Sequence, residues 1–299
     1  MLRKSLGNDK VAVLLLMLPG IIHFLIFKYL PLAGNAIAFQ DYNMFRGIAN
    51  SDWVGLKHFM TIFTYEEFFN VLRNTIIFSF MSIIFGFPAP LILALLLNEV
   101  LRMWFKRTLQ TLLYLPHFLS WVIVGGIFIN LLSIDGVFNA ILSVFGIQPI
   151  DFLTRPEWFR GIIVSIGIWK GIGWGTIIYL AALAGINPNL YEAAVVDGAG
   201  RWKQMWYVTL PSLMPTVVVL FLLQIGNVLE ANVEQILIFL NPLVRDVGEV
   251  IDTYVYRVGL LNAQFSYTTA IGLFQSIVGL VMVMSLNSLS KKVSGESIY

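Results

Sequence analysis

The sequence predicts an all-α polytopic membrane protein with six transmembrane helices. Of its 299 residues, 58% are hydrophobic and only 12% are charged, whereas a soluble domain carries about 25% charged residues. Lipid must therefore solvate much of the surface. A transmembrane helix needs roughly 20 mostly apolar residues. The stretches that meet this requirement are approximately 11–30, 71–97, 109–132, 161–184, 212–240 and 268–289.

The segments between these stretches are too short for a soluble domain, so we expect one transmembrane domain over residues 1–299, with a cytoplasmic loop at 185–211. Lys and Arg are unevenly divided between the two sides. One side has Arg3, Lys4, Lys10, Arg102, Lys106, Arg107, Arg201, Lys203, Lys291 and Lys292, and the other has Arg46, Lys57, Arg155, Arg160, Arg245 and Arg257. Because cytoplasmic loops carry the excess of basic residues, both termini are predicted to be cytoplasmic.

The first apolar stretch could be read as a secretory signal, because basic residues precede it and Ala36-Ile37-Ala38 could serve as a cleavage site. Its apolar run is longer than the 7–15 residues of a signal peptide. We therefore expect it to be retained as the first span.

The sequence lacks the residues that are characteristic of several classes of protein. Without cysteine, disulfides, thiolate metal sites and cysteine nucleophiles are excluded. The sequence has no phosphate-binding GxxxxGK[ST] loop, no HExxH motif and no GxSxG elbow. Its three histidines, His23, His58 and His117, are too scattered to form a zinc site. A net charge of +2 does not indicate nucleic-acid binding. We expect no catalytic residue, metal or bound cofactor in this chain.

The polar segment Leu190–Pro211 lies between two strongly apolar stretches. Its helix-forming start predicts a short helix along the membrane surface. Gly198 and Gly200 permit a tight turn after this helix, and Asp197 could cap the turn or pair with Arg201. Pro211 suits the first turn of the fifth span. Such a helix could be pushed by another protein, although an ordinary amphipathic connector is the alternative.

Polar and small residues within the fourth and fifth spans form two further patterns. Gly167, Gly171 and Gly175 give the fourth span a bare face that suits close helix packing. On a continuous helix, Gln224, Asn227, Glu230 and Glu234 fall within an arc of about 120°. Carboxylates at membrane depth require water or partners, so this face predicts a water-lined pathway or a polar subunit seam. Lys170 is a candidate partner, and Gln275 could join the group.

The polar segment also carries a family resemblance. Glu192-Ala193-Ala194, Gly198 and Leu210-Pro211 match the signature of ABC importer permeases, with Val208 in place of its Ile. Further matching segments are Asn74-Thr75, Phe87-Pro88-Ala89-Pro90, Leu95-Leu96-Leu97-Asn98-Glu99 and the run from Tyr114 to Trp121. Over residues 11–292 the chain resembles the first permease of carbohydrate importers of the maltose, alginate and polysaccharide types. The alginate type is the most similar. The extra N-terminal spans and large outer insertion of the maltose permease are absent from this sequence.

This resemblance implies a type I ABC importer permease fold in a bacterial plasma membrane. It implies a second permease as heterodimer partner, two ATPase subunits that bind ATP and Mg, an extracytoplasmic binding protein and an oligosaccharide substrate.

The resemblance, together with the polar residues at membrane depth, predicts two sets of site residues. The residues that would couple to the ATPase are Tyr191, Glu192, Ala193, Ala194, Asp197, Gly198 and Pro211. The residues of the substrate pathway would be His117, Trp121, Trp169, Lys170, Trp174, Asn227 and Glu230. Trp rings can stack on sugar faces, but lipid-facing or packed aromatics are the alternative. An ion-coupled carrier, an importer of a non-sugar solute and an intramembrane enzyme remain alternative functions.

Overall fold

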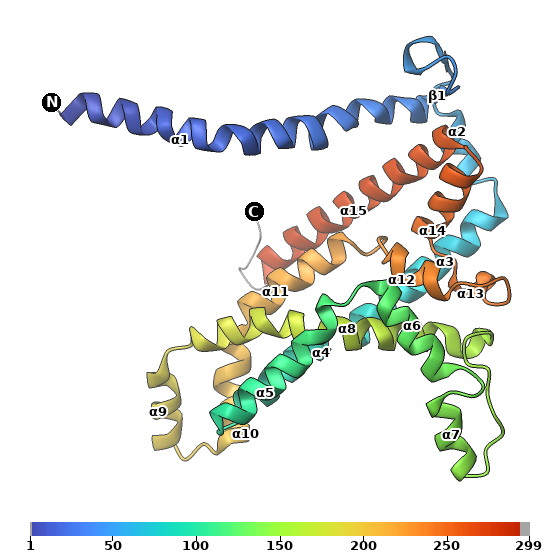
Figure 1. Cartoon of the computed structure of the whole chain (residues 1–299). Helices are drawn as coiled ribbons and strands as arrows, with labels where there is room; N and C mark the ends of the chain where they lie inside the picture. The colour runs from blue at the N-terminus through green and yellow to red at the C-terminus, as the bar shows by residue number, and fades with distance from the viewer. Residues whose placement is uncertain (1, 294–299) are drawn as a thin grey trace. The chain divides into compact units, whose positions relative to one another are not determined.

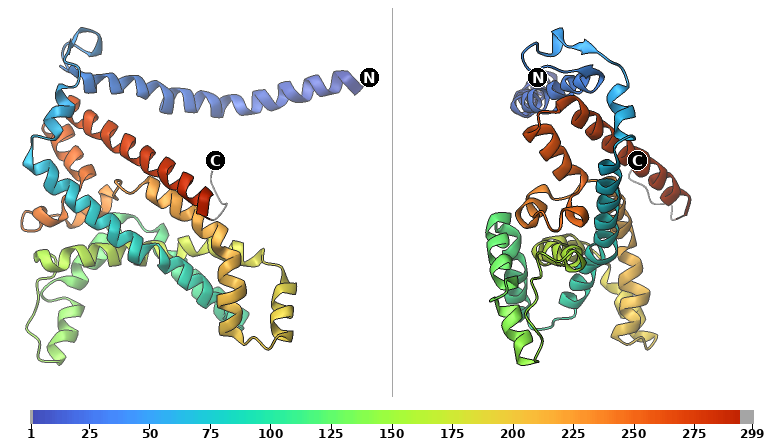
Figure 2. Two further views of the ribbon diagram at one scale, coloured as in Figure 1. Left: turned by 180° about the vertical axis from the view of Figure 1, so that it is seen from behind. Right: turned by 90° about the vertical axis from the view of Figure 1, so that its right-hand side faces the viewer.

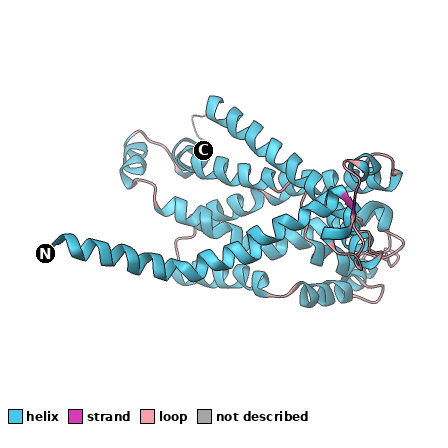
Figure 3. Cartoon of the chain, turned by 90° about the horizontal axis from the view of Figure 1, so that it is seen from above, coloured by secondary structure: helices cyan, strands magenta, loops and turns pink. Residues whose placement is uncertain are grey.

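The computed structural model describes residues 2–293, which form two compact units. Unit 1 consists of Met1–Tyr65 with Val255–Phe274, and unit 2 consists of Glu66–Tyr254 with Gln275–Tyr299. Within the described residues, six helical stretches are long and apolar enough to cross a membrane. They are Ala12–Phe39, Glu66–Asn98, Trp121–Val144, Pro156–Ala184, Arg201–Gly226 and Phe265–Ser288. The predicted fold class of six transmembrane helices is confirmed. Figure 3 shows that almost all regular structure is helical.

Unit 1 begins with a long helical stretch (Figure 1), whose side chains are exposed from residue 12 to residue 33. It consists of α1 (Leu2–Phe24), a π-helical segment η1 (Leu25–Tyr29) and a 3-10 segment η2 (Leu30–Phe39). A two-stranded hairpin, β1 (Gln40–Asp41) with β2 (Asp52–Trp53), follows and encloses η3 (Ile48–Asn50). The unit is completed by α2 (Lys57–Ile62), η7 (Tyr256–Leu261) and the first part of α15 (Phe265–Val293).

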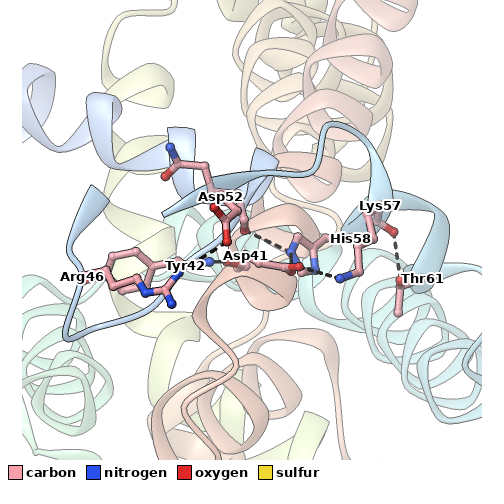
Figure 4. Close-up of polar contacts among 9 residues, drawn as sticks. Asp41, Tyr42, Arg46, Asp52, Lys57, His58 and Thr61 are labelled. Atoms are coloured by element: carbon pink, nitrogen blue, oxygen red, sulfur yellow. Dashed lines mark hydrogen bonds and ion pairs between the residues drawn. The ribbon is translucent and has the colours of Figure 1, made fainter. Parts of the chain in front are cut away.

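Asp41 is the centre of a polar cluster at this hairpin (Figure 4). Its carboxylate accepts a hydrogen bond from Lys57 Nζ at 2.6 Å and lies 3.0 Å from His58 Nε2. The hydrogen bond from Lys57 is the main reason that the pKa of Asp41 lies below its ordinary value. The cluster therefore ties β1 to α2.

Unit 2 is organised around α8 (Pro156–Ala184), which is seen nearly end-on in the right panel of Figure 2. It packs against α3, α4, α5, α11, α12 and α13. The helices before α8 are α3 (Glu66–Met81), η4 (Ser82–Gly86), α4 (Pro88–Asn98), α5 (Met103–Tyr114), η5 (Leu115–Phe118), α6 (Trp121–Leu132) and α7 (Val137–Val144). Those after it are α9 (Pro188–Val196), α10 (Arg201–Gln204), η6 (Met205–Thr209), α11 (Leu210–Gly226), α12 (Val233–Phe239), α13 (Arg245–Gly248) and α14 (Ile251–Val255).

Two predicted spans are interrupted in the structure. The stretch predicted at 109–132 is divided, because α5 and η5 end at Phe118 and α6 begins at Trp121. Pro116 cannot donate a backbone hydrogen bond, and Ser120 caps the new helix by accepting from Ile123 N at 3.3 Å. The stretch predicted at 212–240 is also divided, since α11 ends at Gly226 and α12 begins at Val233. The assumption of one continuous polar helix face in the fifth span was therefore wrong.

The matched pair Asn74-Thr75 has a packing function in unit 2. The buried Asn74 side chain donates to Asp246 O at 2.9 Å and Glu249 O at 3.0 Å. It also accepts from Arg160 Nη2 at 2.7 Å. Thr75 Oγ1 accepts from Ile251 N at 2.9 Å. These bonds satisfy backbone groups of α13, of the residue that follows it and of the start of α14, and so fix this segment to α3 and α8.

Candidate functional site

The short helix α9 lies with α10 at one end of unit 2 (Figure 1). Asn187 caps its start by accepting from Asn189 N at 3.0 Å. At its other end, Gly198 has φ +74°. Ala199 N donates to Ala194 O at 2.8 Å, and Gly198 N donates to Val195 O at 3.0 Å. This pair of bonds is a Schellman motif, which needs a left-handed residue at the position of Gly198.

Side-chain contacts hold α9 and the segment after it against neighbouring helices. Tyr191 Oη and Thr209 Oγ1 lie 2.9 Å apart, so α9 is tied to the start of the fifth span. Arg201 pairs with Glu99 at 3.5 Å, and the expected pairing of Arg201 with Asp197 is not formed. Gly200 has φ −69° in an extended conformation, so only Gly198 requires glycine for its backbone.

Much of α9 is accessible. Glu192 and Ala193 are exposed, and Val196 is 87% exposed. None of the residues of α9 is buried. A rigid, capped helix with exposed apolar side chains is typical of a protein docking surface.

Aromatic side chains from η5, α6 and α8 surround Lys170 of α8. The ammonium nitrogen Nζ of Lys170 donates to His117 O at 2.8 Å and lies 5.2 Å from the centre of the Trp121 ring. The rings of His117 and Trp174 are stacked, with centroids 4.5 Å apart and an interplanar angle of 3°. Lys170 thus bonds to η5 rather than to the carboxylates of the fifth span, and its expected partnership with them is wrong.

Trp169 lies apart from this stack. Its ring meets the edge of Phe128 at a centroid distance of 5.2 Å, and its side chain is 40% exposed. With 3.6 residues per turn, Trp169 is about 160° around α8 from Gly171. The two residues therefore belong to different faces of the helix.

A second polar group lines a cavity of about 520 Å³ within unit 2. Its walls are formed by α3 and η4, α8, α11 and the segment between α11 and α12. The polar residues of its lining are Ser79, Ser82, Gln224, Asn227, Glu230, Asn232 and Gln235. Asn227 and Glu230 are thus at the cavity, whereas His117, Trp121, Trp169, Lys170 and Trp174 are not among its lining residues. The predicted pathway residues are therefore divided between the aromatic group around Lys170 and the cavity, and Trp169 belongs to neither.

The glycines of α8 are divided in function. A Cβ on Gly171 would meet nothing within 4 Å, while one on Gly175 would lie 2.9 Å from Pro90 Cγ. All three predicted glycines line the cavity. The expected close packing is found at Gly175 and at Gly167, where a Cβ would lie 3.4 Å from the Gln235 side chain, but not at Gly171. Gly173 was not predicted, yet a Cβ there would overlap the backbone carbonyl of Leu113. The spacing of the glycines in the sequence did not predict this close approach of Gly173 to the backbone of α5.

Six apolar helices, a capped surface helix and a polar cavity among the spans define a membrane permease. The chain matches the family of binding-protein-dependent transport system inner membrane components over residues 86–295. It belongs to this family, and the resemblance to ABC importer permeases is confirmed.

Two relatives from Bacillus subtilis (strain 168) match almost the whole chain. The polygalacturonan/rhamnogalacturonan transport system permease protein YteP is 50% identical over 286 residues, covering 95% of this chain and 89% of the relative. Protein LplB is 46% identical over 296 residues, covering 99% and 93%.

The fold is also similar to solved structures. The crystal structure of a bacterial ABC transporter involved in the import of the acidic polysaccharide alginate contains a chain with a TM-score of 0.89 and 42% identity, covering 98% of this chain and 99% of that one. A second structure has the same TM-score and identity, and shows the alginate transporter with an alginate pentasaccharide-bound periplasmic protein.

Proposed function

We propose that this chain is a permease subunit of an ATP-driven importer that moves acidic oligosaccharides across the membrane by alternating access. Two similar proteins support an acidic substrate, since one is named for polygalacturonan and rhamnogalacturonan and the other imports alginate. Polygalacturonan and alginate are both built of uronic acids, which carry a carboxylate on each sugar. The chemistry shared by these substrates is therefore a chain of sugar rings with regular negative charge.

The position of Lys170 is the observation that carries this proposal. It is the only basic residue in the stretch 161–184. Its ammonium has three donors, of which one bonds to His117 O. The adjacent Trp174 ring is 47% exposed. An ammonium with donors to spare beside an accessible aromatic ring can bind a uronate, because the carboxylate pairs with the charge and the sugar face stacks on the ring.

The coupling of this permease to ATP hydrolysis is assigned to α9. In this proposal an ATPase subunit, which binds ATP and Mg, contacts the exposed face of Glu192, Ala193 and Val196. Asp197 and Gly198 shape the turn that follows, Tyr191 ties α9 to Thr209, and Pro211 begins the helix that receives the motion. The chain itself contributes no catalytic residue.

The assembly follows from the same proposal. A second permease completes the pathway as a heterodimer partner, two ATPase subunits bind on the cytoplasmic side, and an extracytoplasmic binding protein delivers the oligosaccharide. Both termini and α9 are cytoplasmic, as the distribution of Lys and Arg predicts.

The test compares Lys170→Gln with Lys170→Arg in the assembled importer reconstituted into proteoliposomes. Uptake of labelled trigalacturonate is measured beside uptake of a neutral arabinotriose. A hydrogen bond to a charged group contributes about 1.5–3 kcal/mol, so Lys170→Gln should reduce trigalacturonate uptake about tenfold or more. Lys170→Arg keeps the charge and should retain most of the uptake. Equal losses for both sugars in Lys170→Gln, or no loss for trigalacturonate, would overturn the acidic-substrate proposal.

Neutral oligosaccharides are the second candidate substrate. The 520 Å³ cavity favours them, because its polar lining combines amides with the carboxylate of Glu230 and includes no Lys or Arg among the described lining residues. Amide and carboxylate groups bond to sugar hydroxyls. Wild-type uptake of arabinotriose without uptake of trigalacturonate would favour this candidate.

A further inference from the structure

The stretch predicted as the fifth span, 212–240, is interrupted beside the cavity, at the end of α11. α11 ends at Gly226, three residues of turn follow, and α12 begins at Val233 with Asn232 as its cap. A break in a transmembrane helix frees backbone N–H and C=O groups that lipid cannot satisfy. Such a break persists only where side chains of neighbouring helices or water take the place of the lost hydrogen bonds.

Three side chains from three other helices serve the freed groups. Ser79 of α3 donates to Val228 O. Gln275 of α15 donates to Leu229 O at 3.0 Å. Asp252 of α14 accepts from Ala231 N at 2.6 Å. All of these residues belong to unit 2. Because they come from three separate helices, the break is stabilised by each of these helices.

Asp252 and Gln275 also contact each other. Gln275 Nε2 donates to Asp252 Oδ1 at 3.2 Å, while the other carboxylate oxygen, Oδ2, accepts from Ala231 N. One side-chain pair therefore bonds to the backbone two residues apart, at Leu229 and at Ala231. We call the pair of Asp252 and Gln275 the break clamp.

The residue between the two clamped positions is Glu230, which lines the cavity together with Asn227. Neither Asp252 nor Gln275 is among the lining residues. The clamp thus fixes the backbone on both sides of a cavity carboxylate without occupying the cavity. Ordinary core packing holds apolar side chains against each other, whereas this pair of side chains orients polar residues of the cavity wall.

We propose that Asp252 and Gln275 are positioning residues of the transport pathway, which hold the break in the fifth span so that Asn227 and Glu230 face the cavity. The role in transport rests on the proposed alternating-access function and adds to it that this cavity is part of the pathway. Loss of the clamp leaves Ala231 N and Leu229 O without their acceptor and donor. The break then shifts to recover hydrogen bonds, and the two cavity side chains shift with it.

The chain offers a direct measurement of this shift, because it contains no cysteine. A single thiol is introduced by Asn227→Cys, and its rate of modification by a water-soluble maleimide is measured in the full importer in proteoliposomes. The rate is then measured in the same background with Asp252→Ala. We expect about a tenfold change in rate, the size associated with losing one buried hydrogen-bond partner. Gln275→Leu should change the rate in the same direction.

Two matched controls separate positioning from general damage. Asp246→Ala removes an exposed carboxylate from the neighbouring α13 and should leave the rate at position 227 unchanged. A thiol introduced by Leu243→Cys, at an exposed site outside the break, should react equally with and without the clamp. If Asp252→Ala fails to assemble, Asp252→Asn keeps one acceptor oxygen and should give a smaller change.

Unchanged labelling at position 227 in assembled Asp252 and Gln275 variants would overturn the clamp. Equal changes at positions 227 and 243 would also overturn it, since they would indicate general loosening. The apparent KM for trigalacturonate uptake should rise in Asp252→Asn at an unchanged amount of complex, and an unchanged KM would refute the role in transport. If the wild-type importer takes up no trigalacturonate, the substrate proposal fails while the labelling result still decides the clamp.

Discussion

Gly198 provides a test of the coupling helix in which the structure isolates one physical cause. Its φ of +74° lies in the left-handed region, and a Cβ placed on it would meet nothing within 4 Å. Gly200, two residues later, would also carry a Cβ in open space, but its φ is −69°. Gly198→Ala and Gly200→Ala therefore add the same methyl group to the same turn. Only the first is forced into an unfavourable backbone conformation.

The expected magnitude follows from the backbone alone. A non-glycine residue in the left-handed conformation costs roughly 1–2 kcal/mol, because its Cβ approaches the following carbonyl. No steric term is added, since neither site has a neighbour within 4 Å. A cost of this size corresponds to a factor of about 5–30 in an equilibrium constant. Gly198→Ala should weaken binding of the ATPase subunit to the permease by this factor, whereas Gly200→Ala should leave it unchanged.

The assay measures binding of the purified ATPase subunit to permease heterodimers in nanodiscs, followed by sugar-stimulated ATP hydrolysis. Gly198→Asn is a graded variant, because Asn tolerates the left-handed region better than Ala. Its binding should fall between those of wild type and Gly198→Ala. Equal binding by Gly198→Ala and Gly200→Ala would refute the claim that the Schellman turn presents α9 to the ATPase.

Two further predictions concern packing and pH. Gly173→Ala should lower the thermal stability of the purified complex by an amount equivalent to about 1–3 kcal/mol, because the added Cβ overlaps Leu113 O. Gly171→Ala should not lower it, because a Cβ there meets open space. Equal melting temperatures for the two variants would contradict this. Because the pKa of Asp41 is lowered from 3.8, its stabilisation of the hairpin should be complete above pH 3.8 and lost as the pH falls through the lower folded-state pKa. Pepsin cleavage at 42–53 should increase in that window for wild type, and an identical pH profile for Asp41→Asn would disprove the assignment.

The sequence was sufficient to predict features that depend on local composition. The six apolar stretches follow from hydropathy, and the turn at Gly198 follows from the preference of a helix end for glycine. The exposed position of α9 follows from its place in the polar segment Leu190–Pro211, between two spans. None of these features requires knowledge of which helices are neighbours.

The features that sequence analysis missed depend on distant partners. The break after Gly226 is stabilised by Ser79, Asp252 and Gln275, which come from three other helices. Gln275 stands out in the sequence as a polar residue of the sixth span, but nothing in the segments of Ser79 and Asp252 indicates this contact. The separation of Trp169 from the cavity, by contrast, was predictable from helical geometry, because it is about 160° from Gly171 on the same helix.

Along the chain, α9 lies between α8 and α11, two helices that line the cavity. This connection gives the structure a physical route from its surface to its interior. α9 follows α8 after a short turn at Gly185–Asn187, and α10 and η6 connect it to α11. α8 supplies Gly171 and α11 supplies Gln224 to the cavity lining. In the proposed function a displacement of α9 acts on both helices, and the bond between Tyr191 and Thr209 links α9 to the segment that precedes α11. Since a partner shifts a conformational equilibrium only by its differential affinity for the two states, the proposed coupling requires an ATPase that binds α9 with different strength in each state.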